Sequence, residues 1–264
     1  MIFFIPESPR WLAGVIRYDK AGNILARIGG RDYAIAELDE IKSTAQAKSQ
    51  KTSFRMLFKG SMPKILLIGV VLAAFQQWCG INVIFNYAQE VFAAAGYGVS
   101  DILFNIVVTG ITNVFSTFVG MYAVDRLGRR ALLLFGASGL ACIYTIMGIC
   151  YYFQVTGIAV LCLVVAAIAC FAMTLGPVVW VVLSEIFPTR MRGMAMAVAT
   201  FSLWTACFVL TYTFPMLNRG LGSYGIFWLY GVICVIGYIF VMKMLPETKG
   251  KSLEEIEKKV LNIK

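Results

Sequence analysis

The segment FQQWCGINVIFNY, residues 75–87, places side-chain amides inside an otherwise apolar stretch. In hydrocarbon a carboxamide costs several kcal/mol unless it finds hydrogen-bond partners. One such amide would be explained by a hydrogen bond between helices, worth about 0.6 kcal/mol. Four of them within eleven residues, flanking Gly80, indicate a ligand site instead. The four are Gln76, Gln77, Asn82 and Asn86.

Helical geometry sets a condition on this site. At 100° per residue, Gln77 and Asn82 lie about 140° apart around a straight helix. Both can face one ligand only if the helix is broken between them, and broken membrane helices carry substrate sites in transporters. The sequence therefore predicts a non-helical kink around Cys79 to Ile81.

Further polar and aromatic residues lie in the middle of other apolar windows. Asn113 has no polar neighbour in its window, and Gly176-Pro177 is expected to interrupt another window, with Trp180 one turn later and Trp204 in the next window. Tryptophan near a membrane interface is often only an anchor, so a pocket role for these two indoles is one of two readings. Glu90 is the single acidic residue within the apolar windows, and it is expected near the outer surface. Amides suit hydroxyl groups and indole faces suit C–H surfaces, so an uncharged sugar fits such a site.

The elements that must position these residues are membrane helices. The chain has 264 residues, of which 59% are hydrophobic and 14% charged, with a mean hydropathy of +0.78. A membrane-spanning helix needs about 20 mostly apolar residues. Six windows qualify, at residues 65–92, 102–124, 131–152, 157–183, 194–217 and 224–244. The predicted fold is an all-α membrane protein with a bundle of six transmembrane helices.

Charge gives this bundle an orientation. The net charge is +9, and Lys and Arg gather in both tails and in two connections, DRLGRR and SEIFPTRMRG, whereas the opposite side has only Arg219. Positive charge favours the cytoplasmic side, so both termini are expected in the cytoplasm and the protein in the cell membrane, with the bilayer rather than nucleic acid as the partner of this charge.

Several classes of chemistry are disfavoured. The chain has no histidine, which removes His-based catalysis and His-ligated metal sites. Its seven cysteines lie in apolar runs without a CxxC pair, and are interpreted as packing residues rather than disulfide or metal ligands. We therefore expect no enzyme activity, no metal and no cofactor.

A short internal similarity predicts the domain organisation. FFIPESPRW (residues 3–11) and KMLPETKGK (residues 243–251) each place Pro-Glu-Ser/Thr after apolar residues and before positive charge. A repeat would make residues 1–5 the end of an earlier helix bundle, although chance also explains the likeness because Pro-Glu is common at helix exits. Residues 1–64 are then that helix end plus a cytoplasmic linker with short helices, 65–245 the six-helix bundle, and 246–264 a cytoplasmic tail. In the linker, Ile35, Leu38 and Ile41 are expected on one helix face.

At this point the motifs QQWCGIN, DRLGRR, GPVVWVVLSEIFPTRMRG, PETKGKSLEE and PESPRWL resemble the sugar porter family of the major facilitator superfamily. Bacterial xylose–proton symporters and hexose facilitators are both similar. The resemblance implies the C-terminal half of a twelve-helix fold, with the N-terminal six-helix half missing from this chain. It also implies sugar contacts, matched residue by residue, from Gln76, Gln77, Asn82, Tyr87, Asn113, Gly176, Trp180 and Trp204.

Two positions depart from the family pattern. The paired tyrosines of the family appear here as Asn86-Tyr87, and Leu203 stands where relatives often carry Gln or Asn. The loss of a polar contact at Leu203 would change which sugar is bound. On the cytoplasmic face the resemblance implies a charge network that latches one transport state, although positive-inside topology alone also explains these residues. The network comprises Asp125, Arg126, Arg129, Arg130, Glu185 and Arg192.

The resulting interpretation is alternating-access transport of a neutral monosaccharide, a pentose or hexose with a xylose-like sugar favoured, coupled to protons. The six windows hold no buried carboxylate to carry that proton, so a hexose facilitator of the uniporter type is the alternative. A half-transporter remnant without transport activity is the third interpretation.

Overall fold

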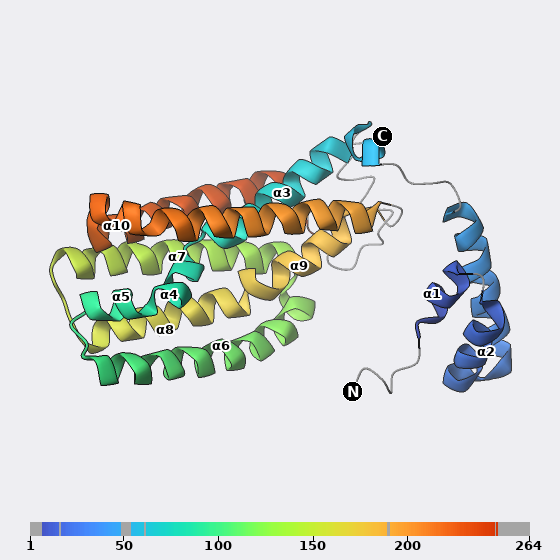
Figure 1. The fold of residues 1–264 in the computed structure, drawn as a ribbon, viewed down its shortest axis with the longest axis horizontal. Coiled ribbons are helices and arrows are strands. Elements are labelled where there is room, and N and C mark those ends of the chain that lie inside the picture. Colours follow the sequence, from blue (N-terminus) through green and yellow to red (C-terminus); the bar gives the residue numbers. More distant parts are fainter. Residues whose placement is uncertain are drawn as a thin grey trace. The chain divides into compact units, whose positions relative to one another are not determined.

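The computed structural model describes residues 7–15, 17–48, 54–60, 62–188, 191–245 and 247. Within these residues every regular element is a helix and there is no strand. The chain divides into two compact units, Met1–Ser53 and Phe54–Lys264, which we describe separately (Figure 1). The expected helix end at residues 1–5 lies outside the described residues, as does the expected cytoplasmic tail at 246–264 except for residue 247.

The first unit contains two helices, α1 (Pro9–Gly14) and α2 (Tyr18–Lys48). Gly30 interrupts α2 with a φ of +87°, so α2 is two helices joined at a kink. A small core forms from Ala13, Leu25, Ala34 and Ile41. One of the three residues expected on the apolar face was wrong. Ile41 is buried and Leu38 packs against this core, but Ile35 is 63% exposed, and Ala34 is buried in its place.

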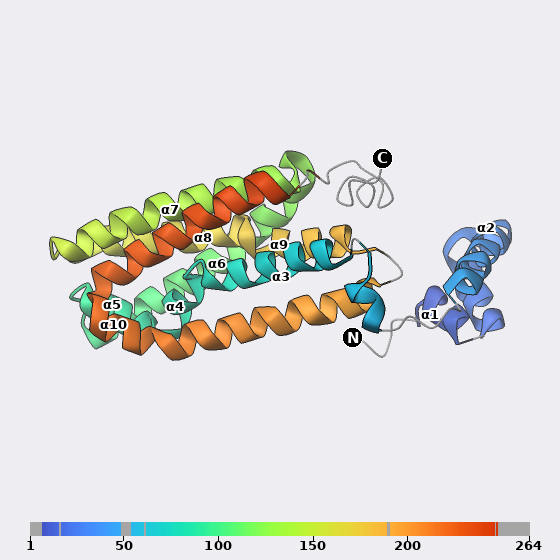
Figure 2. The same ribbon diagram turned by 90° about the horizontal axis from the view of Figure 1, so that it is seen from above.

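The second unit is a bundle of long apolar helices. Among the described residues, five helical segments are long and apolar enough to cross a membrane. The last of them, α10, has 53 residues and would be about 80 Å long if straight, far more than the roughly 30 Å of a bilayer core. Gly222 has a non-helical conformation inside α10, and the chain reverses direction there (Figures 1 and 2). The predicted six-helix fold class is confirmed, with α10 supplying the last two crossings. The elements are η2 (Phe54–Phe58), α3 (Met62–Trp78), α4 (Ile81–Asn86), α5 (Ala88–Ala94), α6 (Val99–Leu127), α7 (Arg129–Tyr152), α8 (Ile158–Met173), α9 (Leu175–Ile186) and α10 (Arg192–Met244).

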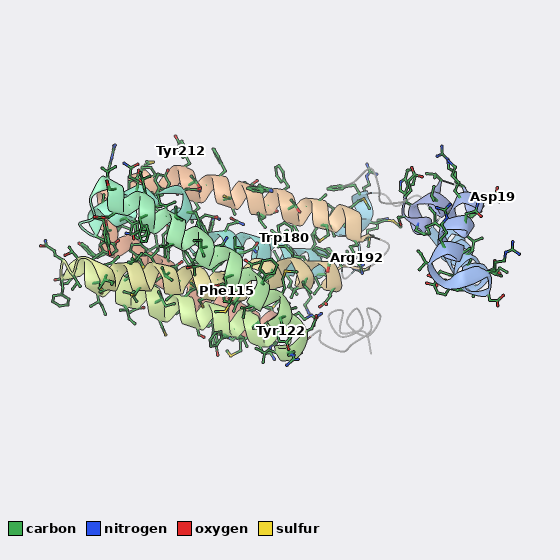
Figure 3. The ribbon with its side chains drawn as sticks, turned by 90° about the horizontal axis from the view of Figure 1, so that it is seen from below. Asp19, Phe115, Tyr122, Trp180, Arg192 and Tyr212 are labelled. Carbon is green, nitrogen blue, oxygen red and sulfur yellow. The ribbon has the colours of Figure 1, made fainter. Side chains whose placement is uncertain are left out.

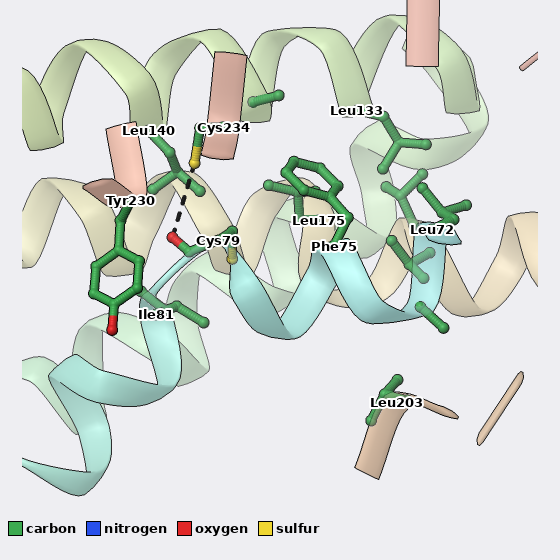
Figure 4. Packing of buried hydrophobic residues seen from close by; sticks show 14 of the residues in the cluster. Leu72, Phe75, Cys79, Ile81, Leu133, Leu140, Leu175, Leu203, Tyr230 and Cys234 are labelled. Carbon is green, nitrogen blue, oxygen red and sulfur yellow. Dashed lines mark hydrogen bonds between the residues drawn. The ribbon is translucent and has the colours of Figure 1, made fainter. Parts of the chain in front are cut away.

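The first crossing is broken where the amide geometry required it. Helix α3 ends at Trp78, Gly80 adopts a left-handed conformation with φ of +90°, and α4 begins at Ile81. A β-carbon on Gly80 would lie 2.6 Å from the ring of Tyr230, so both the backbone conformation and the space favour glycine. The Cys234 thiol donates to the carbonyl of Cys79 at 3.8 Å (Figure 4), so the second half of α10 packs directly against the break.

The fourth crossing is also broken, but not at the predicted residues. The non-helical residue between α8 and α9 is Thr174, with φ of −126° and ψ of −91°, whereas Gly176 and Pro177 lie in the first turn of α9. Proline is tolerated in a first helical turn because the N–H it lacks would have no intrahelical acceptor there. Gly176-Pro177 therefore marks the first turn of the helix that begins one residue after the break, and not the break itself.

Burial differs strongly between helices. In the most apolar window of the α3–α4 segment 61% of the residues are buried, against 22% in α6. Helix α3 lies between the two halves of α10 in Figure 2, whereas α6 presents large apolar side chains outward, among them Phe104, Phe115 and Tyr122. The broken, amide-bearing helix is therefore central to the bundle.

Candidate substrate-binding site

Gln76 is the most buried of the predicted site residues, at 3% exposure. Its Nε2 donates to two carbonyls of α9, Leu175 O at 3.0 Å and Gly176 O at 2.9 Å. Its Oε1 is buried and has no hydrogen-bond partner within the described residues. The amide nitrogen thus joins α3 to the start of α9, and only the oxygen remains available for a ligand.

Gln77 and Asn82 lie on opposite sides of the Gly80 break and contact each other. Asn82 Nδ2 donates to Gln77 Oε1, so the break does bring these two side chains together. Both side chains are half-buried. Gln77 Nε2 and Asn82 Oδ1 make no hydrogen bond in the described part of the chain, which leaves one donor and one acceptor side by side.

Asn113, Trp180 and Trp204 also retain unused polar groups. The side chain of Asn113 is half-buried, and its amide makes no hydrogen bond to any described residue. The two indoles are 38% and 64% exposed, and their N–H groups likewise have no described acceptor. Along the bundle in Figure 3, Trp180 lies between Phe115 and Arg192.

Tyr87 and Asn86 are more firmly held by the protein. The Tyr87 hydroxyl donates to Thr211 O at 2.9 Å, and its ring packs on Phe214 with centroids 4.3 Å apart. Asn86 is exposed and donates weakly to the Thr211 hydroxyl at 3.4 Å. Leu203, the other position that departs from the family pattern, is only 2% exposed and belongs to the apolar core (Figure 4).

A small pocket forms beside Tyr87, because Phe214, which packs on Tyr87, is one of its lining residues. Glu90, Tyr151, Asn218 and Ser223 also line it, and none of the predicted sugar contacts does so. Apart from Tyr87, which lies between α4 and α5, the predicted contacts belong to α3, α4, α6, α9 and the first half of α10, with two exposed indoles among them. That these residues share one sugar site stays a prediction.

At the other end of the helices, charged residues form direct contacts around Arg129. Its guanidinium bonds to Glu185 Oε1, with Nη2 at 3.0 Å and Nε at 3.1 Å, and it lies 3.4 Å from Asp125. The other members of the predicted network contact different groups. Arg126 stacks on Tyr122, with its Cζ 4.3 Å from the ring centroid, and the remaining two arginines, Arg130 and Arg192, donate to the carbonyls of Met242 and Phe187.

Glu247 is a further member of this cluster that sequence reasoning missed. Its Oε1 accepts a hydrogen bond from the backbone N–H of Arg129 at 3.2 Å, at the first residue of α7. A carboxylate is favoured there because the helix N-terminus is positive. Gly128, with φ of +90°, lies so close that a β-carbon would be 3.1 Å from the carboxylate. The Pro-Glu-Thr repeat was the available signal, because it sets this glutamate apart from the other tail charges.

Comparisons with known proteins agree with this architecture. Residues 1–260 match the family described as "Sugar (and other) transporter". The chain is 38% identical to the D-xylose-proton symporter of Escherichia coli over 97% of its length, and 34% identical to the glucose facilitated diffusion protein of Zymomonas mobilis over 97%. It covers 53% and 55% of those two proteins, so it spans about half the length of these relatives.

A solved structure of a sugar transporter has a similar fold. The proton:xylose symporter XylE bound to 6-bromo-6-deoxy-D-glucose, of the major facilitator superfamily, matches with a TM-score of 0.81 and 37% identity. The match covers 98% of this chain and 55% of that one. The chain belongs to the sugar transporter family of the major facilitator superfamily.

Proposed function

We propose that this chain forms the C-terminal half of a transporter that carries a neutral monosaccharide across the cell membrane by alternating access. The observation that carries the proposal is a set of uncharged hydrogen-bonding groups in the apolar helices that have no partner among the described residues, and we place these groups on one wall of the sugar site. These groups belong to Gln76, Gln77, Asn82, Asn113, Trp180 and Trp204.

The chemistry of this wall favours a sugar over a charged solute. It offers acceptor oxygens, amide donors and indole N–H groups, which match hydroxyls that both donate and accept. The indole faces suit the C–H surface of a pyranose ring. An anion or amine would be expected to bring a charged partner into the membrane core, where such residues are costly and functional. A xylose-like pentose or a hexose fits these groups.

The cluster around Arg129 supports a conformational role. Ion pairs that open and close as two helix bundles rock against each other would shift the balance between the two states by their difference in contact energy. Glu185 in α9 and Arg129 in α7 link two crossings, and Glu247 adds the chain that follows α10. We assign the latch to this group, with both termini on the cytoplasmic side because the positive charge gathers there.

Proton coupling is a separate question from sugar binding. The named relatives include both a proton symporter and a facilitated diffusion protein. The apolar windows contain one carboxylate, Glu90, and its side chain is exposed at the end of the first crossing. Any proton-carrying carboxylate would then come from the other half of the transporter, and a facilitator of the uniporter type remains the alternative.

The test is uptake of radiolabelled xylose, arabinose and glucose by the full-length protein that contains this chain, in vesicles with and without a proton gradient. We expect uptake of at least one of these sugars and no uptake of a sugar acid. Accumulation above the external concentration only with the gradient indicates symport, and equilibration without it indicates a facilitator. No specific uptake of any neutral sugar would contradict the proposal and favour a remnant without transport activity.

A further inference from the structure

The two broken crossings of the bundle are joined by one side chain. Helix α3 ends two residues after Gln76, and α9 begins one residue after the Thr174 break. The amide nitrogen of Gln76 donates to the carbonyls of the first two residues of α9, Leu175 and Gly176, at 3.0 and 2.9 Å. Leu175 and Phe75, the neighbour of Gln76, belong to the same buried apolar cluster (Figure 4). Each helix is therefore tied to the other immediately beside its own interruption.

The two hydrogen bonds use the whole donor capacity of the amide. A primary amide has two N–H groups, and both carbonyls lie within hydrogen-bond distance of the nitrogen. A buried amide that bonds in this way is costly to displace, because both carbonyls and the amide would lose partners in an apolar setting. The remaining oxygen, Oε1, has no partner among the described residues and can only accept.

We propose that Gln76 is a positioning residue that couples the break after α3 to the break before α9, so that the two hinges move together during transport. The inference rests on the proposed function, because hinge coupling matters only in a protein that changes state. It assigns Gln76 two separate tasks. The nitrogen ties the hinges together, and the oxygen accepts a hydrogen bond from a hydroxyl of the sugar.

Gln76→Glu separates these tasks. The substituted carboxyl keeps an acceptor for the sugar at every pH. In its protonated form it donates one hydrogen bond to the α9 carbonyls, but in its ionised form it places two acceptor oxygens against two carbonyl oxygens. Sugar exchange should therefore slow as pH rises, whereas the sugar concentration at half-saturation should change little. A residue that only contacted the sugar would show no such split, because a carboxylate accepts from a hydroxyl at least as well as an amide does.

Asn105→Asp is the matched control. Asn105 is as buried as Gln76, at 3% exposure, but it lies in α6, outside both broken crossings, and is not a predicted sugar contact. Its exchange rate should follow the pH profile of the wild type. The charged side chains on α3, α9 and α10 lie toward the helix ends or beside the Gly222 kink, namely Lys64, Glu185, Arg192, Arg219 and Lys243. The other titratable groups on the packed elements are thiols and phenols, which ordinarily ionise near about pH 8.5 and 10, above the range tested.

The experiment measures exchange of radiolabelled sugar at equal pH on both sides, from about pH 4 to 7.5, in the full-length protein. This range begins near the ordinary pKa of a glutamate, about 4.3. We expect the rate for Gln76→Glu to fall roughly tenfold across this range, the size of one hydrogen bond to a charged group. A profile parallel to those of Asn105→Asp and the wild type would overturn the inference. Failure of the wild type to exchange any sugar would instead overturn the proposed function.

A measurement on the wild type covers the case in which Gln76→Glu fails to reach the membrane. Hydrogen–deuterium exchange should show that saturating sugar changes the protection of residues 79–83 and of residues 174–180 together. A response in one segment without the other would also overturn the coupling.

Discussion

The middle of the bundle and its charged end use polar side chains in opposite ways. The Arg129 guanidinium is bonded throughout, to Asp125, Glu185 and the carbonyl of Val124, although Arg130 Nε and Arg192 Nη2 are buried without a described partner. In the middle, Asn113 and Trp204 make no side-chain hydrogen bond to any described residue. A polar group in the membrane needs partners, so we propose that Arg129 holds helices together and that the middle binds a ligand.

The tryptophans show the same contrast within one residue type. The indoles of Trp78 and Trp228 donate to the carbonyls of Ala206 at 3.0 Å and Thr145 at 3.3 Å, and so tie helices to one another. Trp180 and Trp204 have no acceptor among the described residues. The predictions below test this division, beginning with the largest expected effect.

Replacing Asn113 should affect the ligand and not the fold. Asn113→Leu keeps a similar volume but removes the amide, so sugar affinity should fall roughly tenfold to a hundredfold, the cost of one to two lost hydrogen bonds. Thermal stability in detergent should not fall, because the amide has no partner in the bundle. Isothermal titration and a melting curve measure the two quantities. A drop in melting temperature with unchanged affinity would reverse the assignment.

Replacing Glu185 should do the opposite. Glu185→Ala removes the main partner of Arg129 and should slow transport roughly tenfold, since a change of about 1.4 kcal/mol between two states shifts their ratio by ten. Sugar affinity should stay within about twofold, because no predicted sugar contact touches this residue. Exchange rate and equilibrium binding, measured on the same preparation, separate these effects. Weakened sugar binding with a normal transport rate would show that Glu185 contributes to sugar binding and not to the latch.

The tryptophans allow a crosswise test. Trp204→Phe should weaken sugar binding severalfold, roughly the value of one hydrogen bond, without lowering stability. Trp78→Phe removes the donor to Ala206 O and should cost about 1 kcal/mol of unfolding free energy with little change in binding. Denaturation in a mixed-micelle titration and sugar binding by both variants provide the comparison. If both variants changed binding and stability by the same amounts, the proposed division into ligand-binding and helix-joining tryptophans would be wrong.

Asp125 should give the smallest effect. Its side chain is 80% exposed, and it lies 3.4 Å from Arg129 in an i,i+4 pair. Such exposed pairs contribute at most about 0.5 kcal/mol, so Asp125→Ala should leave both stability and binding nearly unchanged. A fall in melting temperature as large as that of Trp78→Phe would show that the exposed Asp125–Arg129 pair stabilises the bundle more than such pairs usually do.

Much of the fold follows from the sequence because lipid restricts the options to helices. The apolar windows and the kink at Gly80 were predictable from hydropathy and from the angle between Gln77 and Asn82. The Thr174 break was not, because a proline signal in a membrane helix fits both a break and a first helical turn.

The sequence predicts which residue types form the candidate site, but not which of their polar groups are already hydrogen-bonded within the protein. Nothing in the sequence distinguishes an amide whose donors are occupied, as in Gln76, from one that is free, as in Asn113. Leu203 also could not be placed from the sequence, since its neighbour Trp204 is exposed and Leu203 itself is buried. Such assignments depend on which neighbouring helix lies opposite each side chain, and only the packed bundle determines that.

The central claim is that the uncharged polar groups in the middle of the bundle bind a neutral sugar. The most direct test is competition for radiolabelled D-xylose binding to the full-length protein by unlabelled D-xylose and by its sugar acid, D-xylonate, in wild type and in Asn113→Leu. We expect xylose to compete, xylonate not to compete, and the variant to bind xylose at least roughly tenfold more weakly. Equal competition by the acid, or full affinity in the variant, would contradict the claim.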